Sequence, residues 1–148
     1  MSRVLLVEDY PPLAKVVAIG LKRLGHDVER AANLARAKEF EGPFDLAVLD
    51  LELPDGDGVE LAAWLFERER TQQVVFFTAS RDVALRAAAL EFGRIVDKDL
   101  GTERLTTAVG EVLAAVAQEH AVGDTGGARD TGAASVRKFS GLRRKVDG

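Results

Sequence analysis

Four short apolar runs of this chain each end at polar residues that could do chemistry. If the runs are parallel strands of one sheet, their carboxyl ends meet along a common edge, where open α/β sheets build their binding sites. Three carboxylates, a hydroxyl and an ammonium then converge, a set that suits a divalent metal and a phosphoryl group better than acid/base hydrolysis or nucleic-acid readout. The residues, each with the run that it follows, are Glu8 and Asp9 after Val4 to Val7, Asp50 after Leu46 to Leu49, Thr78 after Val74 to Phe77, and Lys98 after Ile95-Val96.

Asp50 follows its apolar run directly, which places it at the end of a buried central strand. A carboxylate there can act as a nucleophile toward phosphorus, or it can bond backbone amides of the following turn. Glu8 and Asp9 favour the first role, because three neighbouring carboxylates repel by roughly 4 kcal/mol per pair at 4 Å and an effective dielectric near 20. A bound cation removes that repulsion, and the all-oxygen ligand set predicts Mg²⁺ or Mn²⁺.

Thr78 and Lys98 complete the chemistry, as a hydroxyl donor and a point charge for phosphoryl oxygens. Alone, each is a weak signal, because a strand-end Thr usually forms strand or caps a helix and a strand-end Lys is usually solvated. Their joint placement beside the carboxylates is what favours a functional role.

Alternating apolar runs and helical periods predict the scaffold that would position these residues. The alternation is typical of repeated βαβ units, so we expect an α/β fold on a parallel sheet, with five βα units ending near residue 118. Asn33 and Thr102 are expected to cap the second and fifth helices. The remaining strand is expected at 28–31, and the helices near 12–24, 34–40, 59–66, 82–92 and 102–118.

The segment 53–58, Leu-Pro-Asp-Gly-Asp-Gly, is dense in turn residues. It looks like a calcium loop, but Val59 and Glu60 occupy the positions where the EF-hand pattern places an acid or Asn and then Gly. We therefore interpret this segment as a turn.

Composition excludes several classes of protein. The 148 residues, 47% of them hydrophobic, can bury one substantial core, which corresponds to about one domain. The chain has no cysteine, which excludes disulfides and thiolate metal sites. Because no apolar segment approaches about 18 uninterrupted residues, neither secretion nor a membrane span is indicated, and we expect a cytoplasmic protein.

Charge is divided unevenly along the chain. Residues 1–120 carry a net charge of −7, whereas residues 121–148 carry +3. An acidic body argues against direct DNA binding by the globular domain, because nucleic-acid binding needs a basic face that replaces counterions. We therefore expect a globular domain over 1–120 and a flexible basic tail over 121–148.

The predicted tail holds 6 of the 14 glycines, and up to about residue 134 it is typical of a flexible linker. Beyond that point, four apolar residues fall near one helical face among five basic ones, a pattern that would suit an acidic partner, nucleic acid or a membrane surface. Gly141 interrupts the pattern, and so short a helix is marginal alone, which favours disorder. We expect no DNA-binding or enzymatic output module in this chain. The patterned residues are Val136, Phe139, Leu142 and Val146, among Arg137, Lys138, Arg143, Arg144 and Lys145.

Four motifs together resemble the receiver domain of bacterial two-component response regulators. They are Val-Glu-Asp at 7–9, Leu-Asp-Leu-Glu-Leu-Pro-Asp-Gly-Asp-Gly at 49–58, Thr-Ala at 78–79, and Lys98. The resemblance covers about 118 of the 148 residues and implies a single-domain response regulator. It also implies a doubly wound, flavodoxin-like parallel sheet of five strands in the order 2-1-3-4-5, with helices on both faces.

The resemblance also implies a role for each site residue. Asp50 would be the phosphoacceptor, supplied by a histidine kinase or a phosphotransfer protein. Mg²⁺ would be held by Asp9 and Asp50, by Glu8 through water, and by the backbone carbonyl of Glu52. Thr78 and Lys98 would hold the phosphoryl oxygens of the product. Phosphorylation would change a partner-binding surface or relay the group onward, and the protein would catalyse only its own phosphorylation and dephosphorylation.

Two departures from the family pattern lie beside the predicted site. The family usually places an aromatic switch residue three positions before the Lys, where this chain has Ile95, which has no ring to rotate inward behind Thr78. The family usually follows the Lys with a cis proline, where this chain has Asp99. A non-proline cis bond costs roughly 3 kcal/mol, so we expect this loop to be either trans and rearranged or strained.

Two other functions compete with the phosphoacceptor interpretation. Because of Ile95 and Asp99, a phosphorylation-independent, receiver-like interaction module is the alternative. A Mg²⁺-dependent phosphatase of the haloacid-dehalogenase type ranks third, because it would need a second Asp two residues after the nucleophile, where Glu52 stands.

Overall fold

The computed structural model describes residues 2–123, and residues 124–148 lie outside the described part. The predicted boundary near residue 120 and the predicted basic tail therefore stay predictions. The chain divides into a unit of residues 1–109 and a second unit that starts at Gly110, inside the last helix. The sheet and all side chains of the candidate site belong to the first unit. Among the described residues, no helix combines the length and the apolar character needed to cross a membrane.

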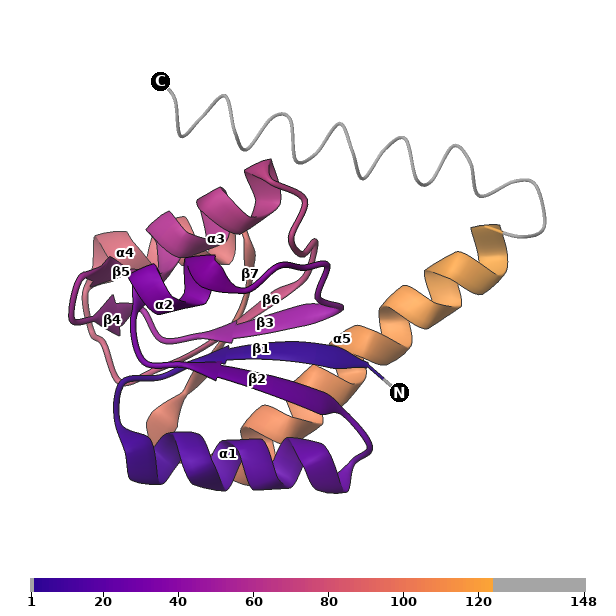
Figure 1. Ribbon diagram of the computed structural model, residues 1–148, viewed down its shortest axis with the longest axis horizontal. Coiled ribbons are helices and arrows are strands. Elements are labelled where there is room, and N and C mark those ends of the chain that lie inside the picture. Colours follow the sequence, from indigo (N-terminus) through magenta and orange to yellow (C-terminus); the bar gives the residue numbers. More distant parts are fainter. Residues whose placement is uncertain (1, 124–148) are drawn as a thin grey trace. The chain divides into compact units, whose positions relative to one another are not determined.

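A parallel sheet of five strands forms the centre of the first unit (Figure 1). Its strands are β1 (Arg3–Val7), β2 (Asp27–Ala31), β3 (Leu46–Leu49), β6 (Val74–Thr78) and β7 (Gly93–Asp97). They lie in the order β2-β1-β3-β6-β7, which confirms the expected order 2-1-3-4-5. Because every neighbouring pair is parallel, all the carboxyl ends meet at one edge of the sheet.

Helices cover both faces of this sheet (Figure 1). They are α1 (Pro11–Arg23), α2 (Leu34–Glu39), α3 (Gly58–Glu67), α4 (Val83–Leu90) and α5 (Thr102–Gly123), together with a 3-10 turn, η1 (Lys98–Leu100). α1 and the first turns of α5 lie on one face, and α2, α3 and α4 lie on the other. Asn33 caps α2 as predicted, accepting a hydrogen bond from the Arg36 amide at 2.8 Å. The last helix extends to Gly123, beyond its predicted end.

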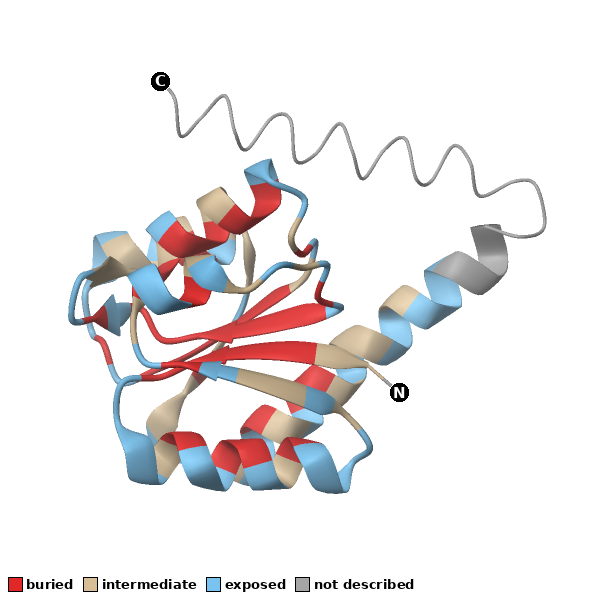
Figure 2. Ribbon diagram, viewed as in Figure 1, coloured by how far each residue is buried: buried red, intermediate tan, exposed pale blue. Residues whose placement is uncertain are grey.

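The core lies along the three central strands. Every residue of β3 and β6, and of β1 after Arg3, is buried, whereas the edge strands β2 and β7 are only partly covered (Figure 2). Strands that are covered on both faces need a continuous apolar run rather than an alternating one, and this explains the sequence pattern. The site residues therefore follow rigid, buried segments of backbone.

The segment 53–58 forms a tight hairpin, which confirms its interpretation as a turn. Its strands are β4 (Glu52–Leu53) and β5 (Gly56–Asp57), paired antiparallel. Asp57 caps α3, accepting the Glu60 amide at 2.8 Å. Asp55 caps α2 from a distance, because its carboxylate accepts the amides of Leu34 at 2.8 Å and Ala35 at 3.1 Å. These backbone hydrogen bonds hold the pKa of Asp55 below its usual value.

Candidate functional site

The ends of β1 and β3 bring three carboxylates together. Val7 pairs with Leu49 in the strand register, so the residues that follow them, Glu8 and Asp50, lie side by side at the sheet edge. One oxygen of each, with one of Asp9, lies within 4.8 Å of the others. Glu8 and Asp50 are 5% and 6% exposed, whereas Asp9 is open to solvent. The donors are all hard oxygens, one of them accessible, and so the cluster fits Mg²⁺ or Mn²⁺.

Lys98 joins this cluster from the end of β7. Its ammonium lies 2.7 Å from Asp50 Oδ2 and 2.8 Å from Glu8 Oε1, bridging the two buried carboxylates. With all three acids ionised, the four side chains carry a net charge of −2, which a divalent cation would balance. The convergence of Lys98 with the carboxylates, expected from the sequence, is therefore present in the structure.

Burial and ion pairing have opposite effects on the pKa values of Glu8 and Lys98. Burial raises the pKa of Glu8 and outweighs the hydrogen bonds from Lys98 and the Tyr10 amide and the charge of Lys98, which lower it; the nearby charge of Asp50 adds a smaller upward contribution. Burial also acts to lower the pKa of Lys98, but hydrogen bonds and charge from both Asp50 and Glu8 outweigh it, so that pKa is raised. Both pKa values are therefore raised, for different reasons. Two carboxylates stabilise the charged form of Lys98, whereas the single ammonium beside Glu8 is too little to offset its burial.

Backbone contacts fix the position of Asp50. Its amide donates to the carbonyl of Val7 at 3.2 Å, and its Oδ1 accepts the Glu52 amide at 3.2 Å. The turn-bonding role weighed from the sequence is thus present together with the cluster. A Cβ at Gly58 would clash with the Asp50 carbonyl oxygen, so only glycine lets α3 start this close to the acceptor strand. Glu52 begins the hairpin two residues after Asp50, and the role of its carbonyl as a metal ligand stays a prediction.

Thr78 ends β6 at the same edge and is fully buried. It pairs in register with Asp97, the residue before Lys98. Its Oγ1 accepts the Ser80 amide at 3.0 Å, which leaves the hydroxyl proton to donate elsewhere. Within the described part of the chain, no hydrogen bond joins Thr78 to the carboxylates, so its role toward a phosphoryl group stays a prediction.

The two departures from the family pattern have different structural outcomes. Ile95 lies opposite Phe76 in the sheet and is half-buried. Asp99 lies in η1, and the Lys98–Asp99 bond is trans, since Gly42–Pro43 is the only cis peptide among the described residues. Of the two bond geometries considered for this loop, the trans one is found.

Two ion pairs in this region could not be found from sequence spacing. Arg86 on α4 lies 2.8 Å from Asp97, and Arg81 lies 3.7 Å from Asp99. Each joins the segment after β6 to a residue beside Lys98. The partners of each pair lie on different elements, so no spacing within one helix or strand relates them, and only the tertiary fold brings them together.

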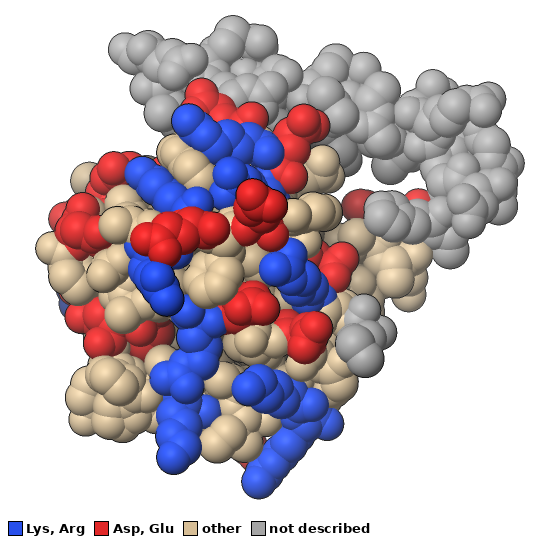
Figure 3. Space-filling model, in the orientation of Figure 1, with Lys and Arg blue, Asp and Glu red and all other residues tan. Residues whose placement is uncertain are grey.

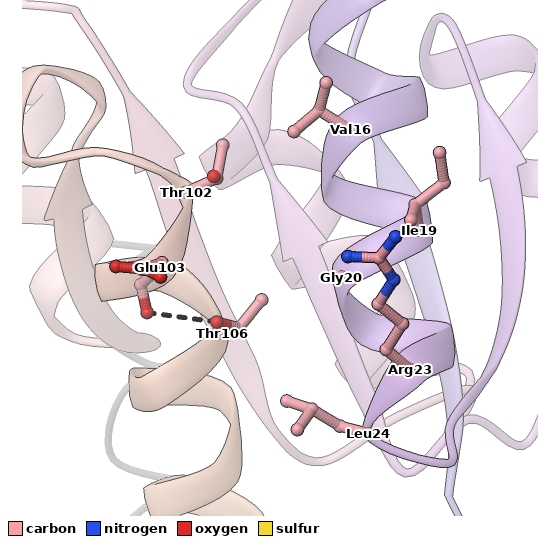
Figure 4. A pocket seen from close by; sticks show the side chains of 8 residues that line it. All are labelled: Val16, Ile19, Gly20, Arg23, Leu24, Thr102, Glu103 and Thr106. Atoms are coloured by element: carbon pink, nitrogen blue, oxygen red, sulfur yellow. Dashed lines mark hydrogen bonds between the residues drawn. The ribbon is translucent and has the colours of Figure 1, made fainter.

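One hollow lies away from the carboxylates. It is a groove of about 480 Å³ between α1 and the start of α5, lined by Val16, Ile19 and Leu24 on one side and by Thr102 and Thr106 on the other (Figure 4). It shares no residue with the cluster. A smaller hollow of about 280 Å³ includes Glu8, beside Arg30 and Arg36. The convergence of charged side chains, rather than the size of a cavity, therefore locates the site.

Comparison with known proteins points in the same direction as this geometry. A family model described as the response regulator receiver domain matches residues 4–110. Response regulator protein PilR of Pseudomonas aeruginosa is 35% identical over 98 residues, which are 62% of this chain and 22% of PilR. Response regulator receiver protein CpdR of Brucella abortus is 34% identical over 87 residues, 57% of this chain and 72% of CpdR. The chain thus spans about a fifth of PilR, and 53% of ArlR of Staphylococcus epidermidis.

Solved structures agree. The signal receiver domain of a putative Luxo repressor protein from Vibrio parahaemolyticus superimposes with a TM-score of 0.71 at 29% identity, over 82% of this chain and 96% of that one. The BeF3-activated DrrB receiver domain superimposes with a TM-score of 0.67 at 26% identity, over 77% and 98%.

Proposed function

Because the chain belongs to the response regulator receiver domain family, we propose that it is a phosphorylation-regulated signalling protein in which Asp50 accepts a phosphoryl group. The observation that carries the proposal is the meeting of Glu8, Asp50 and Lys98 at one buried point beside Asp9. Beside an ammonium, a carboxylate is a weak base. It is nevertheless a competent nucleophile toward phosphorus when the negative charge of the phosphoryl group is neutralised.

In the transfer step, the bonds made and broken lie between Asp50 and the donor. One Asp50 oxygen attacks phosphorus and forms an acyl phosphate, while the bond from phosphorus to the donor's leaving atom breaks. We propose a phosphohistidine of a histidine kinase or a phosphotransfer protein as the donor. Its imidazole nitrogen leaves with the electron pair of the broken bond.

Mg²⁺, or Mn²⁺ in its place, is the proposed cofactor. Asp9 and Asp50 would hold the ion directly, with Glu8 acting through water and Glu52 through its backbone carbonyl. When bound, the ion neutralises charge on the transferring phosphoryl group. The accessible carboxylate of Asp9 gives the ion its route into an otherwise buried cluster.

Lys98 has two successive partners in this proposal. Before transfer, its ammonium neutralises the buried acids Glu8 and Asp50. After transfer, the phosphoryl oxygens carry the larger negative charge, and Lys98 moves onto one of them while the Thr78 hydroxyl donates to another. The protein would then present a changed partner-binding surface or pass the group onward, and it would catalyse only its own phosphorylation and dephosphorylation.

A second function is favoured by one specific observation. Ile95 supplies no ring to follow the movement of Thr78, so the surface beyond β7 lacks the usual means of reporting phosphorylation. A receiver-like module that binds its partner without regard to phosphorylation is therefore the alternative.

Labelling with acetyl phosphate, followed by intact mass measurement, tests the proposal. The wild type should gain one phosphoryl group only with Mg²⁺ or Mn²⁺ present, and Asp50→Asn should gain none. Asp27→Asn is the matched control, because this exposed aspartate pairs with Arg3 at the amino end of β2, at the edge of the sheet opposite the cluster. Equal labelling of wild type and Asp50→Asn would remove the phosphoacceptor role, and normal partner binding by Asp50→Asn would favour the alternative.

A further inference from the structure

A single guanidinium nitrogen ties three parts of the switch region together. Arg86 Nη1, on α4, donates to Asp97 Oδ1 at 2.8 Å and to the carbonyl oxygen of Ser80 at 3.1 Å. Asp97 is the last residue of β7, and Ser80 lies in the loop after β6. One side chain therefore fixes the ends of two neighbouring strands relative to one another.

These contacts continue without a break to both groups proposed to hold the phosphoryl oxygens. On one side, the Ser80 amide donates to Thr78 Oγ1 at 3.0 Å, so the same residue that accepts from Arg86 orients the threonine hydroxyl. On the other side, Asp97 is covalently followed by Lys98, whose ammonium bridges Asp50 and Glu8. The path Thr78, Ser80, Arg86, Asp97, Lys98 thus joins the hydroxyl to the ammonium.

The geometry assigns Arg86 the role of a positioning residue that holds the Thr78 hydroxyl and the Lys98 ammonium in register for phosphoryl transfer to Asp50. This inference rests on the proposed function of Asp50. Arg86 touches neither the carboxylates nor the donor, and so it acts only through Ser80 and Asp97.

The Arg86–Asp97 ion pair is more deeply buried than the Arg81–Asp99 pair. The side chains of Arg86 and Asp97 are 27% and 28% exposed, whereas those of Arg81 and Asp99 are 75% and 68% exposed and lie 3.7 Å apart. Exposed pairs are screened and contribute little, but a half-buried pair with a second, charge-assisted hydrogen bond to a carbonyl keeps its geometry. Arg81 is therefore a matched control for the loss of an arginine at this edge.

The kinetic test compares Arg86→Met, Arg86→Lys and Arg81→Met in Mg²⁺-dependent labelling by acetyl phosphate. Arg86→Met should lower the maximal labelling rate about tenfold, as loss of a charged hydrogen bond implies, and leave the donor concentration at half-maximal rate unchanged. Arg86→Lys should restore much of the rate, because an ammonium can donate to both Asp97 and Ser80. Arg81→Met should behave as wild type. If Arg86→Met labels at the wild-type rate while the wild type labels normally, the positioning role is wrong.

A second measurement does not depend on labelling. In the unphosphorylated protein, Arg86→Met should shift the amide signals of Thr78, Ser80 and Lys98, although Arg86 itself lies on α4. Arg81→Met should leave the Thr78 signal in place. Unchanged signals at Thr78 and Lys98 in Arg86→Met would overturn the inference, whereas failure of the wild type to label, with these shifts present, would overturn only the proposed function.

Discussion

The ends of β1 and β3 differ from the segment 79–92, between β6 and β7, in the forces that hold them. Glu8 and Asp50 follow buried strands, and their positions are set by backbone hydrogen bonds such as the one from the Asp50 amide to Val7. The segment 79–92 is tied to β7 by side-chain contacts, above all the half-buried ion pair of Arg86 with Asp97. Acidic and basic side chains also alternate over the face shown in Figure 3, without one sign dominating.

This difference separates the residues that carry out phosphoryl transfer from those that adjust its rate. Strand register is shared by all the residues of a sheet and is costly to change, so the acceptor cluster is rigid. A side-chain contact such as the Arg86–Asp97 pair can be lost singly, without a change of strand register, so the segment 79–92 can vary without loss of the acceptor. We therefore expect substitutions in the cluster to abolish labelling and substitutions in the segment to tune it.

The largest effect is expected for Lys98→Met. Removing the ammonium takes away the donor to the product phosphoryl group, and the labelling rate should fall at least about a hundredfold, on the scale of losing one electrostatic stabiliser of a transition state. Affinity for Mg²⁺, measured by calorimetry, should rise, because Lys98 no longer competes for Glu8 and Asp50. Lys15→Met, an exposed lysine of α1, is the control. Weaker Mg²⁺ binding by Lys98→Met would contradict the competition.

Gly58→Ala tests the rigidity of the acceptor strand. The added methyl would meet the Asp50 carbonyl oxygen, so the protein should lose about 1–3 kcal/mol of unfolding free energy and label more slowly. Gly110→Ala is the matched control, because nothing lies within 4 Å of its added methyl, and a helical alanine there should gain about 1 kcal/mol. Chemical denaturation measures both. A stable Gly58→Ala with normal labelling would show that the strand tolerates displacement.

A phosphoryl mimic should affect β6 and β7 to different extents. With beryllofluoride and Mg²⁺, amide shifts should be larger in the loop after β6, around Thr78, than in β7, because Ile95 has no ring to carry the change. NMR spectra recorded with and without the mimic measure this. Shifts at Ile95 as large as those at Thr78 would show that β7 responds despite its aliphatic side chain.

The smallest effect concerns Asp55, on the far side of the hairpin from Asp50. Its pKa is lowered in the folded protein by the amides of Leu34 and Ala35, so its ionised form stabilises the fold. That contribution is present above the unfolded pKa of about 3.9 and is lost as the pH falls through the lower folded pKa. Unfolding free energies of wild type and Asp55→Asn should therefore differ at neutral pH and converge under acid.

Local signals in the sequence were enough for the strands and for the acceptor cluster. Apolar runs that end in Glu8, Asp50 and Thr78 encode a parallel sheet with its site at one edge, because strand direction alone brings those ends together. The choice between a trans and a strained Lys98–Asp99 bond stayed open in the sequence. It depends on the energy of the whole loop rather than on one residue type.

Contacts between remote side chains could not be predicted in this way. Asp55 was interpreted only as part of a turn, yet its carboxylate caps α2 across 21 positions. Arg86 and Asp97 likewise meet only after α4 has packed beside β7. No periodicity links such residues, and so their roles emerge from the tertiary arrangement.

Identification of the labelled residue tests the central claim most directly. Protein labelled with acetyl phosphate and Mg²⁺ can be reduced with borohydride, which converts an acyl phosphate to a stable alcohol, and then mapped by peptide mass spectrometry. The reduced side chain should be found at Asp50 and should be absent without Mg²⁺. A modified residue at Glu8, Asp9 or elsewhere, or no modified peptide at all, would contradict the assignment of Asp50 as the phosphoacceptor.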